Sequence, residues 1–321
     1  MRLSRQLATA RHIMISALLG TSPVFADVFV LPADDGAVGA VNQVIATYED
    51  TLTDIGRRHG LGYEEIVLAN PDVDAWLPGE GTTVRLPTRY VLPDTPRRGV
   101  VINLAEYRMY YFHDGEGEQL VSTFPISIGR MDWDSPLGRA GIVAKARNPA
   151  WYPPQSIREE YAADGRSLPA VVPAGPDNPL GEFALRLSLP GYLIHGTNRP
   201  AGVGMRVTHG CIRMFPEDIA WLFPEVDVKT SVRLLNQPVK LGWSGDALLL
   251  EVHPPLEDDA TGQERGLTAI TERYVQLTNK RPAVVDWTLV EKVYAEHSGI
   301  PVVIGQATAP QDVSTVALRS P

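Results

Sequence analysis

Residues 194–214 read IHGTNRPAGVGMRVTHGCIRM and include Cys211, the one cysteine of the 321-residue chain. His195 and His209 stand sixteen and two positions before this cysteine, and a glycine follows each of them. A cysteine attacks as its thiolate, yet a free thiol with a pKa of about 8.5 is mostly protonated at neutral pH. A neighbouring imidazole can take that proton and later return it to a leaving amine. The stretch therefore predicts nucleophilic catalysis by Cys211 with a histidine as general base.

The glycines that follow the two histidines, Gly196 and Gly210, fit the same chemistry. Glycine allows close backbone approach and turns in which successive N–H groups point at one spot. Such N–H groups can hold the oxyanion of a tetrahedral intermediate. We therefore expect both glycines to belong to the catalytic site.

Other interpretations of these residues remain open. His195, His209 and Cys211 could ligate zinc, although a structural zinc site needs about four ligands and the sequence has no second Cys/His pair. The histidines could be hydrogen-bonded core residues, and the cysteine an inert small hydrophobe or half of an intermolecular disulfide. The catalytic interpretation implies neither a metal nor an organic cofactor.

The first residues carry the pattern of a secretory signal peptide. Three arginines precede a short apolar run at residues 13–20, and small residues at 24 and 26 suit a cleavage site before Asp27. The run is far shorter than the roughly 20 residues that span a bilayer. We expect residues 1–26 to be removed on export, with an uncleaved membrane anchor as the alternative. No integral membrane span is expected elsewhere.

The formal net charge of −9 makes the chain acidic, and loss of the three leader arginines makes it more so. An acidic protein is a poor candidate for binding nucleic acid or an anionic membrane. The charge says little about a neutral glycan or a peptide substrate.

The pattern along the rest of the chain predicts an α+β protein. Residues 40–90 show two short amphipathic helices followed by an alternating strand, and residues 97–255 show strands punctuated by turns. The latter favour packed or closed β-sheets over alternating βαβ units. A proline-rich segment at 148–181 is interpreted as a lid, or alternatively as a disordered insertion. Residues 256–305 are expected to form a helical extension and residues 306–321 a mobile tail.

The unit at 40–90 resembles a LysM module, a small βααβ fold that binds cell-wall glycan. The resemblance rests on the start Asp50-Thr51-Leu52, on Ile55, and on Asn70-Pro71 before the last strand. The glycine that usually precedes the Asp-Thr pair is replaced by Glu49. The resemblance implies glycan binding, with a purely structural domain as the alternative.

His-Gly-Thr at 195–197 followed by Thr-His-Gly-Cys-Ile-Arg at 208–213 resembles the signature of the L,D-transpeptidases, which accept Ser or Thr at position 208. The stretches SPLG at 135–138, LPAVVPAG at 168–175 and DNPLG at 177–181 are similar to the periplasmic, LysM-carrying branch of that family. The similarity covers about residues 45–255. It implies a periplasmic protein with a β-rich transpeptidase domain.

The resemblance implies a role for each residue of the motif. Cys211 would attack the carbonyl between diaminopimelate and the terminal D-alanine of a tetrapeptide stem. His195 would be the general base, oriented by the carbonyl of Gly196, which fits the absence of any acidic residue between positions 183 and 216. The backbone amides of His209, Gly210 and Cys211 would form the oxyanion hole, and the His209 side chain would support the thiolate.

The resemblance also suggests residues that bind substrate. Arg213 would meet a stem carboxylate, with a loop-fixing salt bridge as the alternative. Trp151 and Tyr192 would line the cleft, although both could be core aromatics. Thr208 and Asn198 complete the predicted substrate-binding set.

The implied reaction is a thioester acyl-enzyme that transfers its acyl group to an amine. The acceptor could be an outer-membrane lipoprotein, or another stem in a 3→3 cross-link, while water would make the enzyme an L,D-carboxypeptidase. Peptidoglycan, both its stems and its glycan strands, is the implied partner. The rival from another class is a non-catalytic protein that only binds the wall.

Overall fold

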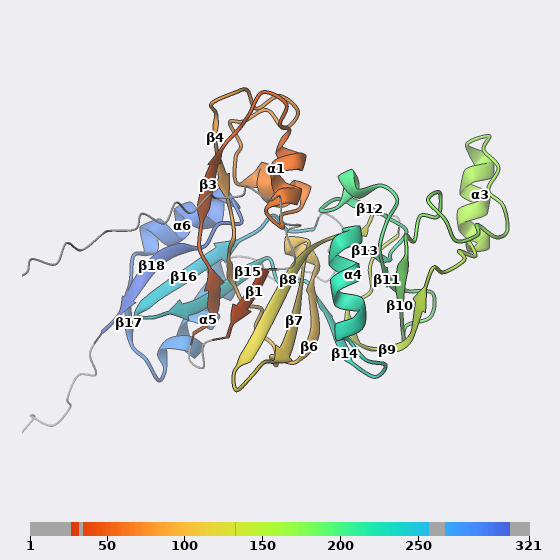
Figure 1. Cartoon of the computed structure of the whole chain (residues 1–321). Coiled ribbons are helices and arrows are strands. Elements are labelled where there is room, and N and C mark those ends of the chain that lie inside the picture. Colours follow the sequence, from red (N-terminus) through yellow and green to blue (C-terminus); the bar gives the residue numbers. More distant parts are fainter. Residues whose placement is uncertain (1–26, 32–34, 132, 257–266, 309–321) are drawn as a thin grey trace, which may run out of the picture.

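The computed structural model describes residues 27–31, 35–131, 133–256 and 267–308, and Figure 1 shows their arrangement. They form a β-rich α+β protein with an N-terminal unit, a central unit of two packed sheets and a C-terminal unit. The predicted signal peptide lies outside the described residues. No described helix is long and apolar enough to cross a membrane.

The central unit is built from two sheets that share strands β8 and β9. One sheet runs β1-β8-β7-β6-β14-β9 and the other β8-β13-β11-β10-β9, with β12 also paired to β8. The strands are β1 (Asp27–Val30), β6 (Gly99–Asn103), β7 (Arg108–Asp114), β8 (Gln119–Gly129), β9 (Gly138–Arg147), β10 (Phe183–Leu187), β11 (Leu193–His195), β12 (Arg206–Thr208), β13 (Ile212–Met214) and β14 (Ser231–Leu235).

Strand β8 explains how the sheets close on each other. Its first part pairs with β7, and its last residues pair with β13 and β12. Because the strand serves both sheets it is buried on both faces from residue 121 onward, and its polar residues Ser122, Thr123 and Ser127 are buried with the apolar ones. Helix α4 (Pro216–Glu225) packs Ile219 and Leu222 into the same core. Its proline at the first position and acids in the first turn are typical of a helix start.

The N-terminal unit has the element order that the LysM resemblance implies. Strand β3 (Asn42–Ile45), helices α1 (Leu52–Arg58) and α2 (Tyr63–Leu68) and strand β4 (Thr83–Leu86) follow one another, and β3 pairs with β4. Thr51 and Asp54 form a capping box at the start of α1. Strands β2 (Ala37–Gly39) and β5 (Arg89–Val91) join the unit to its neighbours. Glycan binding by this unit stays a prediction.

The C-terminal unit corrects the predicted domain boundary at residue 255 and the purely helical extension at 256–305. Strands β15 (Val239–Ser244) and β16 (Ala247–Val252) leave the central sheets and form a sheet with β17 (Ala283–Val285) and β18 (Val302–Ala307). Helices α5 (Leu267–Thr278) and α6 (Trp287–Glu296) pack Ile270, Val290 and Val293 on this sheet. The β15–β16 hairpin buries residues on both faces, including Lys240 and Glu251, so its pattern does not reveal which strands it joins.

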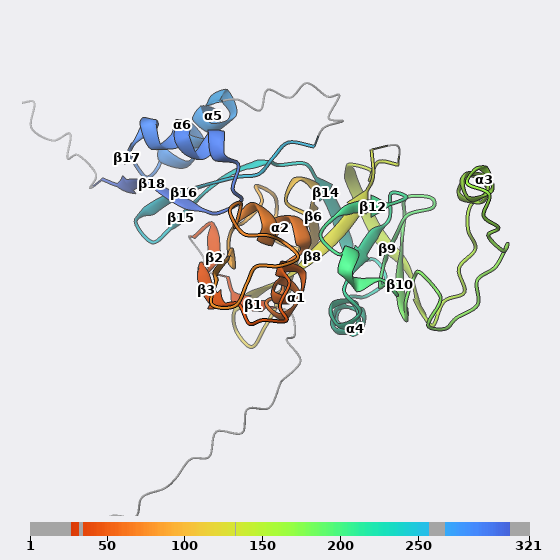
Figure 2. The same cartoon turned by 90° about the horizontal axis from the view of Figure 1, so that it is seen from above.

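The predicted tail at 306–321 also begins too early, because β18 continues to Ala307. Residues 309–321 lie outside the described residues. The segment 148–181 contains a helix, α3 (Gln155–Ala163), that the proline-rich pattern does not suggest. Figures 1 and 2 show α3 standing away from the sheets, at the end of the molecule opposite the C-terminal unit.

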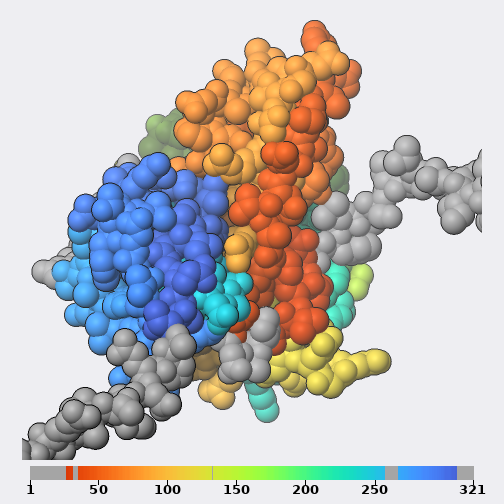
Figure 3. All heavy atoms as spheres, turned by 90° about the vertical axis from the view of Figure 1, so that its left-hand side faces the viewer, coloured from red at the N-terminus to blue at the C-terminus, as the bar shows by residue number. Residues whose placement is uncertain are grey.

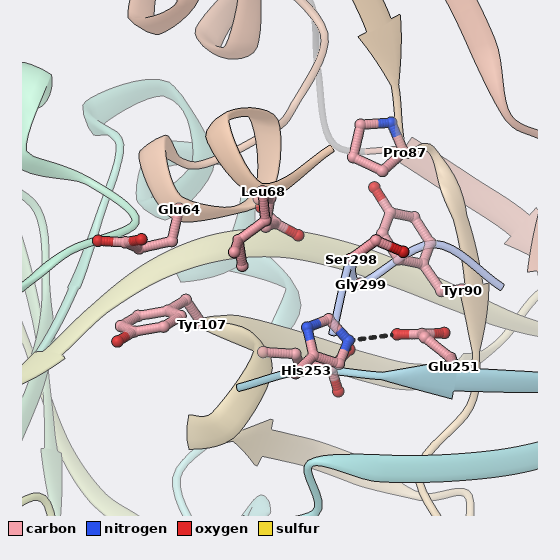
Figure 4. A pocket seen from close by; sticks show the side chains of 11 residues that line it. Glu64, Leu68, Pro87, Tyr90, Tyr107, Glu251, His253, Ser298 and Gly299 are labelled. Carbon is pink, nitrogen blue, oxygen red and sulfur yellow. Dashed lines mark hydrogen bonds and ion pairs between the residues drawn. The ribbon is translucent and has the colours of Figure 1, made fainter. Parts of the chain in front are cut away.

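Buried polar contacts hold the three units together. Figure 3 shows the C-terminal unit, in blue, against the N-terminal strands, where Gly36 N–H donates to the Trp243 carbonyl at 2.7 Å. Beneath them the buried Lys240 ammonium binds Glu106 of the central unit and lies 2.7 Å from Glu251 Oε1. The close-up in Figure 4 shows Glu251 and His253 beside residues of the N-terminal unit. The catalytic candidate is thus part of a larger packed body.

Candidate active site

The strand register brings the motif residues onto one face of the second sheet. Strands β11 and β13 are parallel neighbours, with Ile194 opposite Ile212 and His195 opposite Arg213. Both isoleucines are buried in the core. Because side chains alternate along a strand, His195 and Arg213 point to the other face. Cys211 directly precedes β13, and its sulfur lies beside the backbone of Gly191 and Leu193, at the start of the strand that carries His195.

His195 is held as a neutral base. Its Nδ1 lies 2.7 Å from the carbonyl oxygen of Gly196, the hydrogen bond that the resemblance implies. This contact assigns the ring proton to Nδ1 and leaves Nε2 to accept one. Burial, with the nearby charge of Arg213, lowers the pKa of His195 to about 4. The ring is therefore uncharged at neutral pH and able to take a proton.

Cys211 rests as a neutral thiol. Burial raises its pKa, while the Leu193 N–H and the charge of Arg213 act in the opposite direction. Its Sγ lies 3.7 Å from the carbonyl oxygen of Gly191. Among the described residues, no hydrogen bond joins this sulfur to either imidazole. The arrangement fits proton transfer at the moment of attack better than a standing thiolate–imidazolium pair.

The turn before Cys211 is fixed through its carbonyl groups. The Ser135 hydroxyl donates to the Gly210 carbonyl at 2.9 Å, and the Thr208 hydroxyl donates to the Cys211 carbonyl at 2.6 Å. In a trans peptide the C=O and N–H point in opposite directions, so Ser135 also fixes the direction of the Cys211 N–H. Such a fixed N–H suits an oxyanion hole.

Gly210 itself is required by this turn. Its φ is 93°, and a Cβ there would lie 2.9 Å from Tyr192 Cε1 and 3.2 Å from the Asp134 carbonyl oxygen. A side chain would be strained by the backbone angle and would also displace its neighbours. The geometry therefore requires a glycine at this position, while the catalytic role of Gly210 stays a prediction.

Two predicted roles need correction. Thr208 is a predicted substrate-binding residue, but it is only 3% exposed and its hydroxyl is used within the turn. The His209 side chain, predicted to support the thiolate, instead turns to helix α3, where its Nε2 lies 3.1 Å from Glu160 Oε2. Its ring also meets the edge of Trp133 at 5.1 Å between centroids. Burial lowers the pKa of His209, and Glu160 opposes this effect.

The remaining substrate-binding candidates are placed differently. Arg213 is half-buried beside His195, and no carboxylate within the described ranges forms an ion pair with it, so the loop-fixing salt bridge is not supported. Tyr192 packs against Gly210 next to the cysteine. Asn198 is exposed in the loop after β11, and Trp151 pairs with Val172 inside the segment 148–181. Arg213 and Tyr192 thus border the nucleophile.

Sequence reasoning missed Ser135 and Glu160 as site residues. Ser135 lies in a stretch that contributes to the family resemblance, and it joins β8 to the cysteine turn by accepting from Gly129 N–H at 3.0 Å. Glu160 stands 49 residues before His209 in a proline-flanked segment. No local pattern indicates such a distant pairing.

One group of side chains in the described part of the chain has the spacing to hold a metal ion, and it lies away from Cys211. It consists of Glu106, Glu251 and His253. The Lys240 ammonium already binds both glutamates, and His253 Nε2 lies 2.6 Å from Glu251 Oε1. The Lys240 ammonium therefore occupies the position that a metal ion would take between these carboxylates.

The low pKa of His195 predicts a measurable loss of stability in acid. The folded-state pKa of about 4 is below the 6.5 of a free histidine, so the neutral ring contributes stability above pH 6.5 that is lost as pH falls toward 4. The full effect is about 3 kcal/mol, at about 1.4 kcal/mol per pKa unit. Urea unfolding at pH 7 and 4.5 should show it as a smaller acid loss in His195→Gln than in the wild type. Equal losses in the two proteins would contradict the assignment.

Comparison with known proteins identifies the family of the chain. The family model described as the YkuD L,D-transpeptidase catalytic domain matches residues 97–234. The chain is 38% identical over 287 residues to the probable L,D-transpeptidase YcfS of Escherichia coli (strain K12), covering 87% of this chain and 89% of YcfS.

Two further relatives have similar names. The chain is 39% identical over 282 residues to the probable L,D-transpeptidase YbiS of Escherichia coli (strain K12), covering 85% of this chain and 90% of YbiS. It is 38% identical over 259 residues to the probable L,D-transpeptidase ErfK/SrfK of Salmonella typhimurium (strain LT2), covering 78% of this chain and 81% of the relative. These matches extend well beyond the central unit.

Proposed function

The chain belongs to the L,D-transpeptidase family, and we propose that Cys211 is its nucleophile and His195 its general base. It is thus a peptidoglycan L,D-transpeptidase, an acyltransferase. The observation that supports these two roles best is the parallel pairing of β11, which ends at His195, with β13, which begins directly after Cys211. The hydrogen bond from His195 Nδ1 to Gly196 O leaves Nε2 as the proton acceptor.

The proposed reaction begins on a tetrapeptide stem. Cys211 Sγ attacks the diaminopimelate carbonyl while its proton passes to His195 Nε2, which becomes an imidazolium. The Cys211 N–H, whose direction Ser135 fixes, stabilises the oxyanion together with the other N–H groups of the turn. D-Alanine leaves as the amine and takes the proton from His195, and a thioester remains on Cys211. An incoming amine then attacks the thioester carbonyl and gives a proton to His195. The Cys211 thiolate leaves and takes that proton, and a new amide is formed.

Arg213 is the proposed contact for a stem carboxylate. Its side chain lies opposite that of His195 in the strand register, its Nε is buried, and no described carboxylate pairs with it. A buried cation without a counter-ion is costly, so an anionic ligand would relieve it. Tyr192 beside Gly210 would border the same cleft.

For the acceptor we propose a lysine amine of an outer-membrane lipoprotein, with a second stem or water as the other outcomes. The predicted signal peptide would deliver the enzyme to the periplasm, and the LysM-like unit at 40–90 would hold it on glycan. The names of the relatives give L,D-transpeptidase activity and no acceptor.

Intact mass after incubation with a disaccharide-tetrapeptide tests the proposal. The purified, thiol-reduced protein should gain the donor less one D-alanine, and peptide mapping should place the adduct on Cys211. A folded protein that shows no adduct and releases no D-alanine would favour the wall-binding alternative. Addition of lipoprotein, a second stem or neither then identifies the acceptor. If removing the enzyme from cells leaves protein–muropeptide adducts unchanged while 3→3 dimers vanish, anchoring is wrong.

A further inference from the structure

The segment 148–181 is an ordered arm that carries α3. Trp151 and Val172 exchange two backbone hydrogen bonds, of 2.8 and 2.9 Å, across its base. The buried Asn178 side chain donates to the carbonyls of Pro149 and Pro173 at 2.8 and 3.1 Å. These contacts tie the two ends of the arm together. The arm leaves β9 and returns into β10, so these contacts brace it at the base.

One carboxylate ties α3 to the catalytic turn. Glu160 Oε2 lies 2.6 Å from Arg130, which follows β8, and 3.1 Å from His209 Nε2, two residues before the nucleophile. The three side chains are partly exposed, at 27% for Glu160, 37% for Arg130 and 24% for His209. The neighbouring glutamate, Glu159, instead accepts from Gln155 within α3. Glu160 is thus the acidic group through which the arm contacts two separate elements of the site.

We propose that Glu160 is a positioning residue that holds the arm closed against the His209–Cys211 turn, where it forms one wall of the cleft for the stem peptide. This inference rests on the proposed function. With Glu160 bound, α3 is tethered to the turn by side chains, and the His209 side chain is fixed between Glu160 and Trp133. Without it, the arm swings out, the stem loses a wall, and small molecules reach the thiol more easily.

The contacts of Glu160 with Arg130 and His209, here called the clasp, should weaken with salt because all three side chains are partly exposed. Ion pairs between exposed side chains weaken as ionic strength rises, because the Debye length falls from about 10 Å at 0.1 M to about 3 Å at 1 M. The KM for the stem should therefore rise with salt in the wild type. In a variant without the Glu160 charge it should already be high and change little. A residue that only supported the fold would not produce this difference.

The experiment compares Glu160→Gln with Glu159→Gln. Both variants remove one negative charge from the same helix, but only the first breaks the pairing with Arg130 and His209. Arg130→Gln, which removes one of the two partners, is a second variant expected to give an intermediate effect. Three quantities are measured: KM and kcat for D-alanine release from a tetrapeptide donor at low and high salt, the alkylation rate of Cys211 by iodoacetamide, and Tm.

Glu160→Gln is expected to raise KM about three- to tenfold with kcat changed less than about twofold, and to speed alkylation, at an unchanged Tm. Glu159→Gln should match the wild type. Wild-type KM and alkylation in Glu160→Gln, or equal changes in both variants, would overturn the proposal. If the wild type releases no D-alanine while Glu160→Gln alone still speeds alkylation, the proposed function fails and the clasp stands.

Discussion

Replacement of Cys211 by alanine is expected to abolish both the acyl-enzyme and the release of D-alanine. The chain has no second cysteine, so no other thiol can form the thioester. His195 cannot replace it, because its Nδ1 is committed to the Gly196 carbonyl and its low pKa makes it a weak nucleophile. Rates are measured as D-alanine released from a tetrapeptide donor, and the acyl-enzyme as intact mass.

The same variant should keep its fold. The sulfur makes one long contact, 3.7 Å to the Gly191 carbonyl, whereas the turn is held by backbone groups bound to Ser135 and Thr208. Tm should therefore change little, and a folded Cys211→Ala protein without activity assigns the loss to chemistry. Residual D-alanine release at more than a trace of the wild-type rate would show that another group carries the reaction.

The sequence predicted the parts of the fold whose signals are local. Turn residues bound the strands of the central unit, and β8 is rich in the β-branched and aromatic residues that favour strands. The candidate catalytic stretch could also be predicted from the sequence, because a histidine, a glycine and the cysteine follow one another. Gly210 is an example: its positive φ strongly favours glycine, so the residue type itself indicates the backbone conformation.

Other features depend on pairing between distant residues and were not predictable. Strand β16 pairs with β18, more than fifty residues later, and the buried pattern of β15 and β16 would suit the central sheet equally well. Helix α3 follows two prolines, Pro153 and Pro154. Prolines predict a loop, but a proline is also tolerated where a helix starts, so the helix could not be inferred. The Glu160–His209 contact needs the arm to fold back, which no local spacing records.

The second large effect is expected at the buried ion pair between Glu65 and Arg108. The Arg108 guanidinium is fully buried and binds both oxygens of Glu65 at 2.5 and 2.8 Å, the Gly60 carbonyl at 2.8 Å and the Thr123 hydroxyl. Removing one partner of such a pair leaves an uncompensated charge in the interior, which costs about 3–5 kcal/mol. Glu65→Leu should lower the free energy of unfolding by that amount, as measured by urea denaturation.

A matched control and a double variant sharpen this test. Arg57→Gln breaks a partly exposed pair with Glu217 at the same interface, and such pairs are worth only about 0.2–1 kcal/mol. Glu65→Leu combined with Arg108→Met removes both charges and should recover part of the loss, because apolar replacement of a buried pair is often tolerated. If Glu65→Leu is no less stable than Arg57→Gln, the Arg108 guanidinium must bind water or another partner in that variant.

The pair also links the N-terminal unit to the active site. Glu65 lies on α2, whose first N–H groups, those of Tyr63 and Glu64, donate to the carbonyls of Val203 and Gly204 at 3.1 and 3.3 Å. These carbonyls belong to the loop that connects His195 to the cysteine turn. Gly204 has a φ of 90°, and a Cβ there would lie 2.2 Å from Tyr63 N. Because the loop has this fitted contact with α2, Glu65→Leu should lower activity as well as stability, and Arg57→Gln should leave activity unchanged.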